Sequence, residues 1–122
     1  MSCPFCDMEE GRIIEQGLDW YVIRDNYPVN EGHTLIVLNY HRGYMSAVGE
    51  GAWMELKELL DDQMSQLRDE LGCTDFNIGI NDGPAAGQTI PHLHVHLIPR
   101  FEGDCENPRG GVRKVKLPLV DY

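Results

Sequence analysis

The sequence predicts an α+β protein in which one long helix packs on an antiparallel sheet of about five strands. Residues 50–71 carry apolar side chains at every third or fourth position, which is the spacing of an amphipathic helix. Residues 92–97 instead alternate histidine with apolar residues, which is the two-residue period of a strand. Short apolar segments bounded by turn residues supply the remaining strands.

The first half of the chain contains three of the expected strands. Two short strands at 12–15 and 19–24 are rich in β-branched and aromatic residues and are joined by a turn at Gln16 and Gly17. A loop over 25–32 leads to a nearly continuous apolar strand at 33–38. Such a pattern is typical of a strand that is covered on both faces.

The second half contains the helix and a hairpin. The apolar stripe of the helix is expected to pack on the sheet, and Gly72 suits its C-terminal cap. A strand at 74–80 pairs with the histidine strand, residues 101–111 are irregular, and 112–116 form a possible edge strand. The stripe comprises Trp53, Leu56, Leu60, Met64, Leu67 and Leu71.

Length and composition favour a single domain over residues 1–122. No apolar segment reaches the roughly 18 residues of a membrane span, and residues 1–20 lack the pattern of a secretory leader, so we expect a cytoplasmic protein. A net charge of −10 argues against nucleic-acid strands and anionic membranes as partners. Half of the ten Lys and Arg residues lie between 100 and 116, so a mobile basic tail over about 101–122 is expected, either simply solvated or attracting anions locally.

Three alternate histidines, His92, His94 and His96, are the main chemical signal. On a strand they share one face, with neighbours about 6.6 Å apart. A row of imidazoles needs a metal, an anion or water as a partner, because a buried unpaired ring nitrogen costs free energy. The preceding loop, residues 81–89, is rich in glycine and small residues and could present backbone N–H groups to a phosphate.

The pair Cys3 and Cys6 has a spacing that suits two ligands of one tetrahedral zinc ion, within an N-terminal element over residues 1–10. Redox motifs share this spacing, so the pair alone is moderate evidence. His41 and His92 are the natural candidates for the third and fourth ligands. Cys73 and Cys105 are isolated in the sequence.

The segment from Asn77 to Arg100 resembles the histidine triad (HIT) family of nucleotide hydrolases and transferases. Residues 82–89 before the triad, and Pro99 with Arg100 after it, resemble the Fhit-like branch, the diadenosine polyphosphate hydrolases. The resemblance implies a structural zinc ion held by four protein ligands: Cys3, Cys6, His41 and His92. Fhit-like proteins generally lack the cysteine pair, so this chain combines features of two branches.

The resemblance also implies an active site. His94 is the implied nucleophile toward the α-phosphorus of a purine nucleotide, and His96 donates to the phosphate or bridging oxygen. The nucleotidyl transferases of the wider family have glutamine at the position of His96, so histidine here favours transfer to water. Gln88 is a further implied catalytic residue, which contacts the phosphates and helps position water. The implied contacts to substrate are Thr89 and Asn77 at the phosphates, Asp25 at the ribose, Ile23 at the base and Arg100 at the leaving polyphosphate.

The expected function is hydrolysis of diadenosine polyphosphates or adenosine 5′-phosphoramidates. The alternatives are a nucleotidyl transferase or phosphorylase, and a non-catalytic, zinc-stabilised nucleotide-binding protein. Mg²⁺ could accompany a polyphosphate substrate, although the sequence contains no dedicated carboxylate cage. The resemblance further implies a homodimer in which two sheets join into one.

Overall fold

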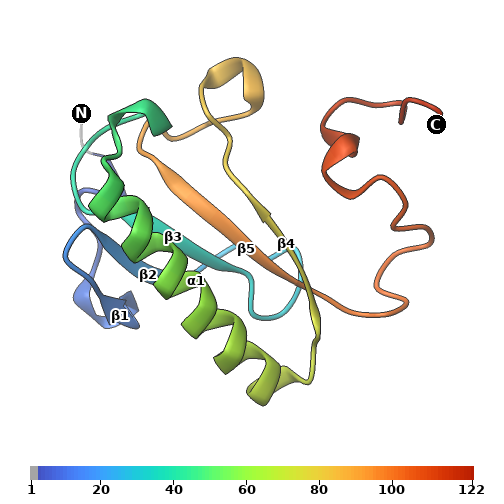
Figure 1. Ribbon diagram of the computed structural model, residues 1–122, viewed down its shortest axis with the longest axis horizontal. Coiled ribbons are helices and arrows are strands. Elements are labelled where there is room, and N and C mark those ends of the chain that lie inside the picture. Colours follow the sequence, from blue (N-terminus) through green and yellow to red (C-terminus); the bar gives the residue numbers. More distant parts are fainter. Residues whose placement is uncertain (1–2) are drawn as a thin grey trace.

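The computed structural model describes residues 3–122, and residues 1 and 2 of the predicted N-terminal element lie outside the described part. A five-stranded antiparallel sheet has the order β1-β2-β3-β5-β4 (Figure 1). The number and antiparallel pairing of the strands confirm the predicted fold class. The predicted hairpin is formed by β4 and β5, in which Asn77 lies opposite Ile98. The strands are β1 (Glu15–Gln16), β2 (Trp20–Arg24), β3 (Thr34–Leu38), β4 (Asp75–Gly79) and β5 (His94–Arg100).

Helix α1 (Glu50–Leu71) lies across one face of this sheet (Figure 1). The helix ends where Gly72 adopts a left-handed conformation, with φ of 73°, and its N–H bonds to the carbonyl of Arg68. Trp53 was expected in the apolar stripe but is 45 % exposed, because it lines an open groove between α1 and β4. The buried helix residues are Ala52, Leu56, Leu59, Leu60, Gln63 and Leu67.

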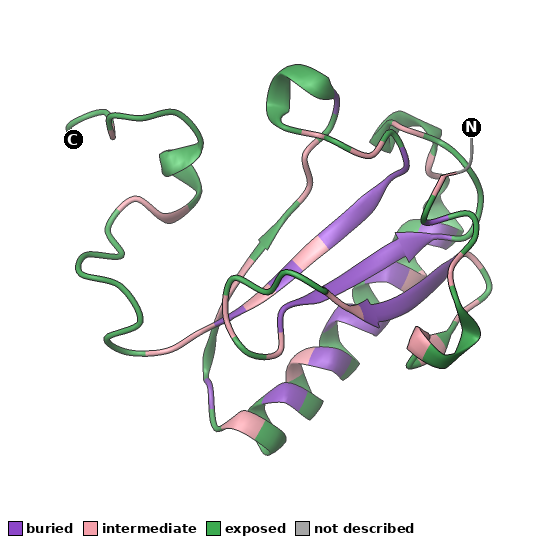
Figure 2. Ribbon diagram, turned by 180° about the vertical axis from the view of Figure 1, so that it is seen from behind, coloured by how far each residue is buried: buried purple, intermediate pink, exposed green. Residues whose placement is uncertain are grey.

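The central strand β3 is buried at every residue, as its continuous apolar sequence predicts (Figure 2). Alternate residues face α1 and the opposite side, where the segment containing Phe5 covers the sheet. In β5, Val95 and Leu97 enter the core beneath α1. His94 and His96 therefore point to the face that α1 does not cover.

Two local predictions were wrong. Residues 112–116 form no edge strand, and a 3₁₀ helix, η4 (Gly111–Val115), occupies this stretch instead. Arg12 belongs to the 3₁₀ helix η1 (Glu10–Arg12), so the first strand begins only at Glu15. The C-terminal segment leaves the sheet after β5 and projects from the domain (Figure 1). No helix of the described residues is long and apolar enough to cross a membrane.

Candidate active site and metal centre

A row of imidazole rings lies on the face of the sheet opposite α1. The ring centroids of His94 and His96, two residues apart on β5, are 5.1 Å apart. His33, immediately before β3, extends the row, with its Nε2 3.0 Å from Nδ1 of His96. His92 lies two residues before the start of β5 at the other end of the row, and it is fully buried. The alternation in the sequence thus places three triad residues together, and the fold adds a fourth histidine.

The tautomer of His94 is set by the backbone. Its Nδ1 lies 2.8 Å from the carbonyl oxygen of His92, which can only accept a hydrogen bond. Nδ1 therefore carries the proton of the neutral ring, and Nε2 keeps its lone pair. The ring of Phe5 packs edge-on at a centroid distance of 4.9 Å. The backbone and Phe5 together hold a ring with an unprotonated Nε2 in one orientation.

A chain of hydrogen bonds sets the tautomer of His96. The backbone N–H of Val29 donates to Nδ1 of His33 over 3.0 Å, so the proton of His33 is on its Nε2. That Nε2–H donates to Nδ1 of His96, which leaves the proton of His96 on its own Nε2. His96 thus presents an N–H donor beside the lone pair of His94.

Burial keeps these rings neutral. It lowers the pKa of His96 to about 4, and the nearby rings of His94 and His33 act in the same direction. Burial also lowers the pKa of His33, against the opposing effect of the Asp25 carboxylate, whose Oδ2 lies 3.5 Å from Nε2 of His33. Near pH 7, His96 is therefore a neutral hydrogen-bond donor rather than an imidazolium acid.

The four predicted zinc ligands converge at one end of the row. The Sγ–Nδ1 distances are 3.4 Å for Cys3 to His92, 3.4 Å for Cys6 to His41 and 3.5 Å for Cys6 to His92. The two Nδ1 atoms of His41 and His92 are 3.2 Å apart. A tetrahedral zinc ion requires S–N separations of about 3.5 Å and an N–N separation of about 3.3 Å. The donor set therefore fits zinc.

A further contact prepares His92 to bind a metal. Its Nε2 lies 2.7 Å from the carbonyl oxygen of Leu38, so Nε2 carries the proton and Nδ1 is free to bind. Four protein donors leave no open coordination position, which is typical of a structural zinc site. The other group of candidate ligand residues among residues 3–122, Asp25 with His33 and His96, contains a single carboxylate. Nothing there supports the expected Mg²⁺.

The glycine loop is anchored to the segment that follows His41. The amide nitrogen of Gln88 donates to the carbonyl of Gly43 over 2.8 Å, and Oδ1 of Asp82 accepts from the N–H of Met45 over 2.8 Å. Gly83 has a φ of 102°, a conformation that a residue with a side chain rarely adopts. The Gln88 amide group thus holds the loop in place. Thr89 is exposed on the same loop.

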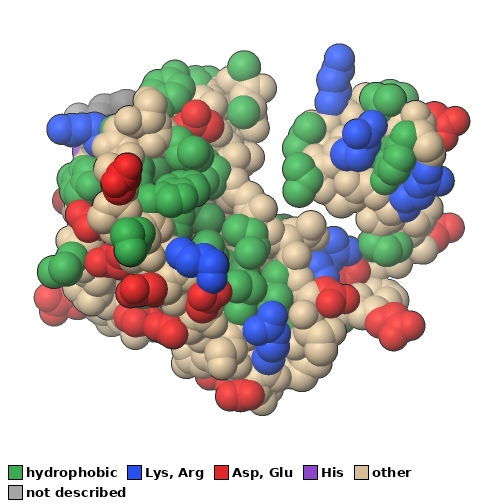
Figure 3. Space-filling model, viewed as in Figure 1, with side chains coloured by type: hydrophobic (Ala, Val, Ile, Leu, Met, Phe, Trp, Pro, Cys, Tyr) green, Lys and Arg blue, Asp and Glu red, His purple; other side chains and the backbone are tan. Residues whose placement is uncertain are grey.

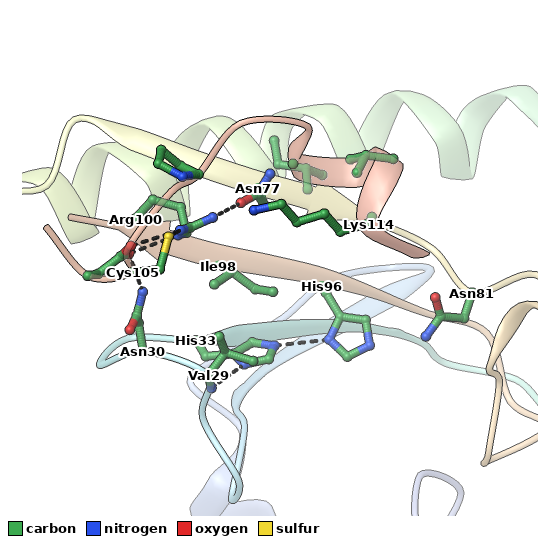
Figure 4. Close-up of a pocket in the computed structure, with 16 residues that line it drawn as sticks. Val29, Asn30, His33, Asn77, Asn81, His96, Ile98, Arg100, Cys105 and Lys114 are labelled. Atoms are coloured by element: carbon green, nitrogen blue, oxygen red, sulfur yellow. Dashed lines mark hydrogen bonds and ion pairs between the residues drawn. The ribbon is translucent and has the colours of Figure 1, made fainter. Parts of the chain in front are cut away.

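A cavity of about 580 Å³ extends from His96 along β5 (Figure 4). Asn77 was expected beside the α-phosphate. Its Oδ1 instead accepts a hydrogen bond from Arg100 over 2.6 Å, and both residues lie further along the sheet than His94. Asn81 occupies the His96 end of the cavity instead (Figure 4). Sequence reasoning missed Asn81, although it begins the glycine loop.

The residues expected at the nucleoside differ in accessibility. Oδ1 of Asp25 accepts from the N–H of Tyr27 over 2.9 Å, and its side chain is 16 % exposed. Ile23 has no exposed surface and packs among apolar residues under the N-terminal segment, so it does not face a base directly. Arg100, which was expected at the leaving polyphosphate, pairs with Asp104 over 2.8 Å.

The structure is thus an α+β protein that carries a row of histidines on one face of its sheet. A Cys₂His₂ cluster lies at one end of this row, and a cavity extends from the other end. The HIT domain family matches residues 9–103, and the chain belongs to that family. The AP-4-A phosphorylase of Mycobacterium tuberculosis is 35% identical over 106 residues, which cover 84% of this chain and 53% of that protein. The match thus spans about half of that relative.

Two solved structures are similar in fold. A Zn-bound histidine triad family protein from Mycobacterium smegmatis has a TM-score of 0.75 and 30% identity, covering 84% of this chain and 78% of that one. Diadenosine triphosphate hydrolase from Plasmodium falciparum has a TM-score of 0.76 and 25% identity, covering 82% and 68% respectively. These relatives support nucleotide processing of the HIT type, and they do not assign the chain to the Fhit-like branch.

Proposed function

We propose that this protein hydrolyses diadenosine polyphosphates at the α-phosphate through a nucleotidyl intermediate on His94. The observation that carries the proposal is the paired tautomers of two adjacent rings. His94 offers a lone pair on Nε2 because its Nδ1 donates to a backbone carbonyl, while His96 offers an N–H from its Nε2. A nucleophile beside a donor is the arrangement that phosphoryl transfer requires.

The first step forms the bond between the lone pair on Nε2 of His94 and the α-phosphorus. The P–O bond to the leaving group breaks, and the leaving phosphate takes the electron pair. The Nε2–H of His96 donates a hydrogen bond to the oxygen on which negative charge develops. In the second step, water attacks phosphorus and the P–N bond breaks, returning its electron pair to His94. The proton that water loses is taken up by the released imidazole and passes to solvent.

The neutral state of His96 favours a phosphoanhydride substrate. A polyphosphate leaves as a stable anion and needs only hydrogen bonds, whereas an amine leaving group needs a proton. A ring whose pKa is about 4 holds no extra proton near pH 7. We therefore place diadenosine polyphosphates ahead of adenosine phosphoramidates. Transfer to inorganic phosphate is the second candidate, because a relative that is 35% identical is an AP-4-A phosphorylase.

The proposed zinc ion has a structural role. Bound zinc supplies cross-linking of chain segments through four coordination bonds and has no open position for substrate. His92 would link this centre to the nucleophile, because its Nδ1 faces the cysteines and its carbonyl oxygen accepts from His94. Cys3, Cys6 and His41 would hold the N-terminal turn and the β3–α1 connection against the same ring.

The proposed assembly is a homodimer. β4 is an edge strand with one unpaired side, and an apolar groove of about 310 Å³ lies between it and α1. Trp53 and Ile78 on either side of this groove are 45 % and 42 % exposed, and Figure 3 shows apolar side chains gathered on this face. A second copy is the natural occupant, because two identical edge strands can pair antiparallel about a two-fold axis.

The test compares wild type with His94→Ala in turnover and in covalent labelling. Wild type should convert diadenosine tetraphosphate and, after rapid quenching, carry an added adenylyl mass. The variant should lose both, with kcat lower by at least three orders of magnitude, while it still binds AMP. Including inorganic phosphate in a parallel reaction distinguishes ATP plus AMP from ADP plus ATP as products, and so separates hydrolysis from phosphorolysis. Unchanged turnover in the variant would refute the assignment, and nucleotide binding by wild type without turnover would indicate a non-catalytic binding protein.

A further inference from the structure

The cavity beside His96 lies on the leaving-group side of the proposed reaction. Side chains of His96, Ile98 and Arg100 alternate on one face of β5, so the cavity floor follows the strand away from His94. Successive floor residues are about 6.6 Å apart, which gives the floor a length of about 13 Å. In an in-line displacement the leaving group departs on the side opposite the nucleophile. A group that leaves beside the Nε2–H of His96 would therefore enter this cavity.

The carboxylate in the cavity is already fully engaged. Asp104 accepts from Nε and Nη2 of Arg100, each over 2.8 Å. It also accepts from the amide of Asn30 over 2.7 Å and from the backbone N–H of Phe101 over 3.0 Å. The Arg100 guanidinium accordingly holds the pKa of Asp104 well below its usual range. The charges of Asp104 and Arg100 neutralise each other, so any net positive charge in the cavity must come from another lining residue.

That residue is Lys114, which reaches the cavity from η4 on the C-terminal segment (Figure 4). Its Nζ bonds to the backbone carbonyl of Asn107, and it forms no ion pair with a carboxylate in the described part of the chain. Asn77 lines the same space, and its Oδ1 accepts a hydrogen bond from Arg100. Together with the Nε2–H of His96, the lining therefore offers a cation and N–H donors in a protein whose net charge is −10.

We infer that this cavity binds the polyphosphate leaving group, and that Lys114 is a specificity residue that selects an anionic leaving group over a neutral one. The inference rests on the proposed function, and it adds the C-terminal segment to the substrate site. An ammonium group attracts successive phosphates of a polyphosphate chain but gains nothing from an uncharged amine. Through Lys114, the segment between 101 and 122 thus determines which leaving group on the adenylyl phosphate the enzyme accepts.

The experiment measures kcat/KM for diadenosine tetraphosphate and for adenosine 5′-phosphoramidate in wild type, Lys114→Gln and Lys116→Gln. Lys116 is the matched control, since it is an exposed lysine of the same segment that does not line the cavity. Lys114→Gln should lower kcat/KM for the tetraphosphate about tenfold, the effect of losing one charged hydrogen bond in a partly solvated site. The phosphoramidate should be cleaved at the wild-type rate, and Lys116→Gln should change neither substrate.

Equal losses on both substrates, or the same loss in Lys116→Gln, would overturn the inference while leaving the proposed function intact. A calorimetric titration with inorganic tripolyphosphate gives a readout that is independent of turnover. Wild type should bind this probe about tenfold more tightly than Lys114→Gln. Equal affinities of wild type and Lys114→Gln for tripolyphosphate would overturn the inference, whether or not wild type cleaves either substrate. A wild type that cleaved neither substrate would by itself refute only the proposed function.

Discussion

Acidification should destabilise this protein through His96. Its pKa falls from 6.5 to about 4 on folding because the ring is buried beside two other imidazoles. Below pH 6.5 the unfolded chain therefore binds a proton that the folded protein does not. The free energy of unfolding decreases as the pH falls through this window, and the contribution of the neutral ring is fully present only above it.

The linkage relation gives a loss of about 2.5 kcal/mol from this residue between pH 7 and pH 4.5. The ring retains some contact with solvent, which screens its surroundings, so we expect about half of this loss, about 1.2 kcal/mol. His96→Asn removes the titration but keeps an acceptor for the Nε2–H of His33, since an asparagine Oδ1 occupies the place of Nδ1.

Urea denaturation of wild type and His96→Asn at pH 7 and pH 4.5 measures the effect. Titrating groups that do not contact His96 contribute equally to both proteins. Their contributions cancel when the change in unfolding free energy with pH is compared between the two, so the difference reports on His96 and the rings that it contacts. Wild type should lose about 1.2 kcal/mol more than the variant. If both lost the same amount, the assignment of a neutral, buried His96 would be wrong.

Four further changes test the metal centre, the fold and the assembly. Cys6→Ser should reduce bound zinc from one per chain to well below one and lower the melting temperature, with Cys105→Ser, an exposed thiol elsewhere, as the control. Glu55→Ala should cost about 1–3 kcal/mol in urea denaturation, because its carboxylate accepts from three backbone N–H groups of the β1–β2 turn. Leu97→Ala should cost about 2–5 kcal/mol in the same assay, because Leu97 is fully buried under α1. Ile78→Asp should convert the proposed dimer into monomers in sedimentation velocity, and a monomeric wild type would refute the dimer.

The sequence alone determined the elements that repeat along the chain. The three- to four-residue period of 50–71 predicted α1 and its end at Gly72, because helix geometry requires that period in a one-sided apolar stripe. The alternation through 94–97 predicted β5 and its two faces for the same kind of reason. Unlike these elements, η4 carries no period, and its apolar residues were wrongly predicted to form an edge strand.

The four candidate zinc ligands could be named from sequence because metal coordination restricts both residue type and local spacing, and the structure brings them together. The tautomer of His96 could not be predicted. It depends on Val29, His33 and His96 meeting across a loop and two strands, and no local pattern encodes that meeting. The same holds for Lys114, which lines the same cavity as His96 only because η4 contacts β4. Periodicity and ligand spacing are local properties that a sequence displays directly, whereas hydrogen-bond partners and cavity linings arise from contacts between distant segments that only the folded chain creates.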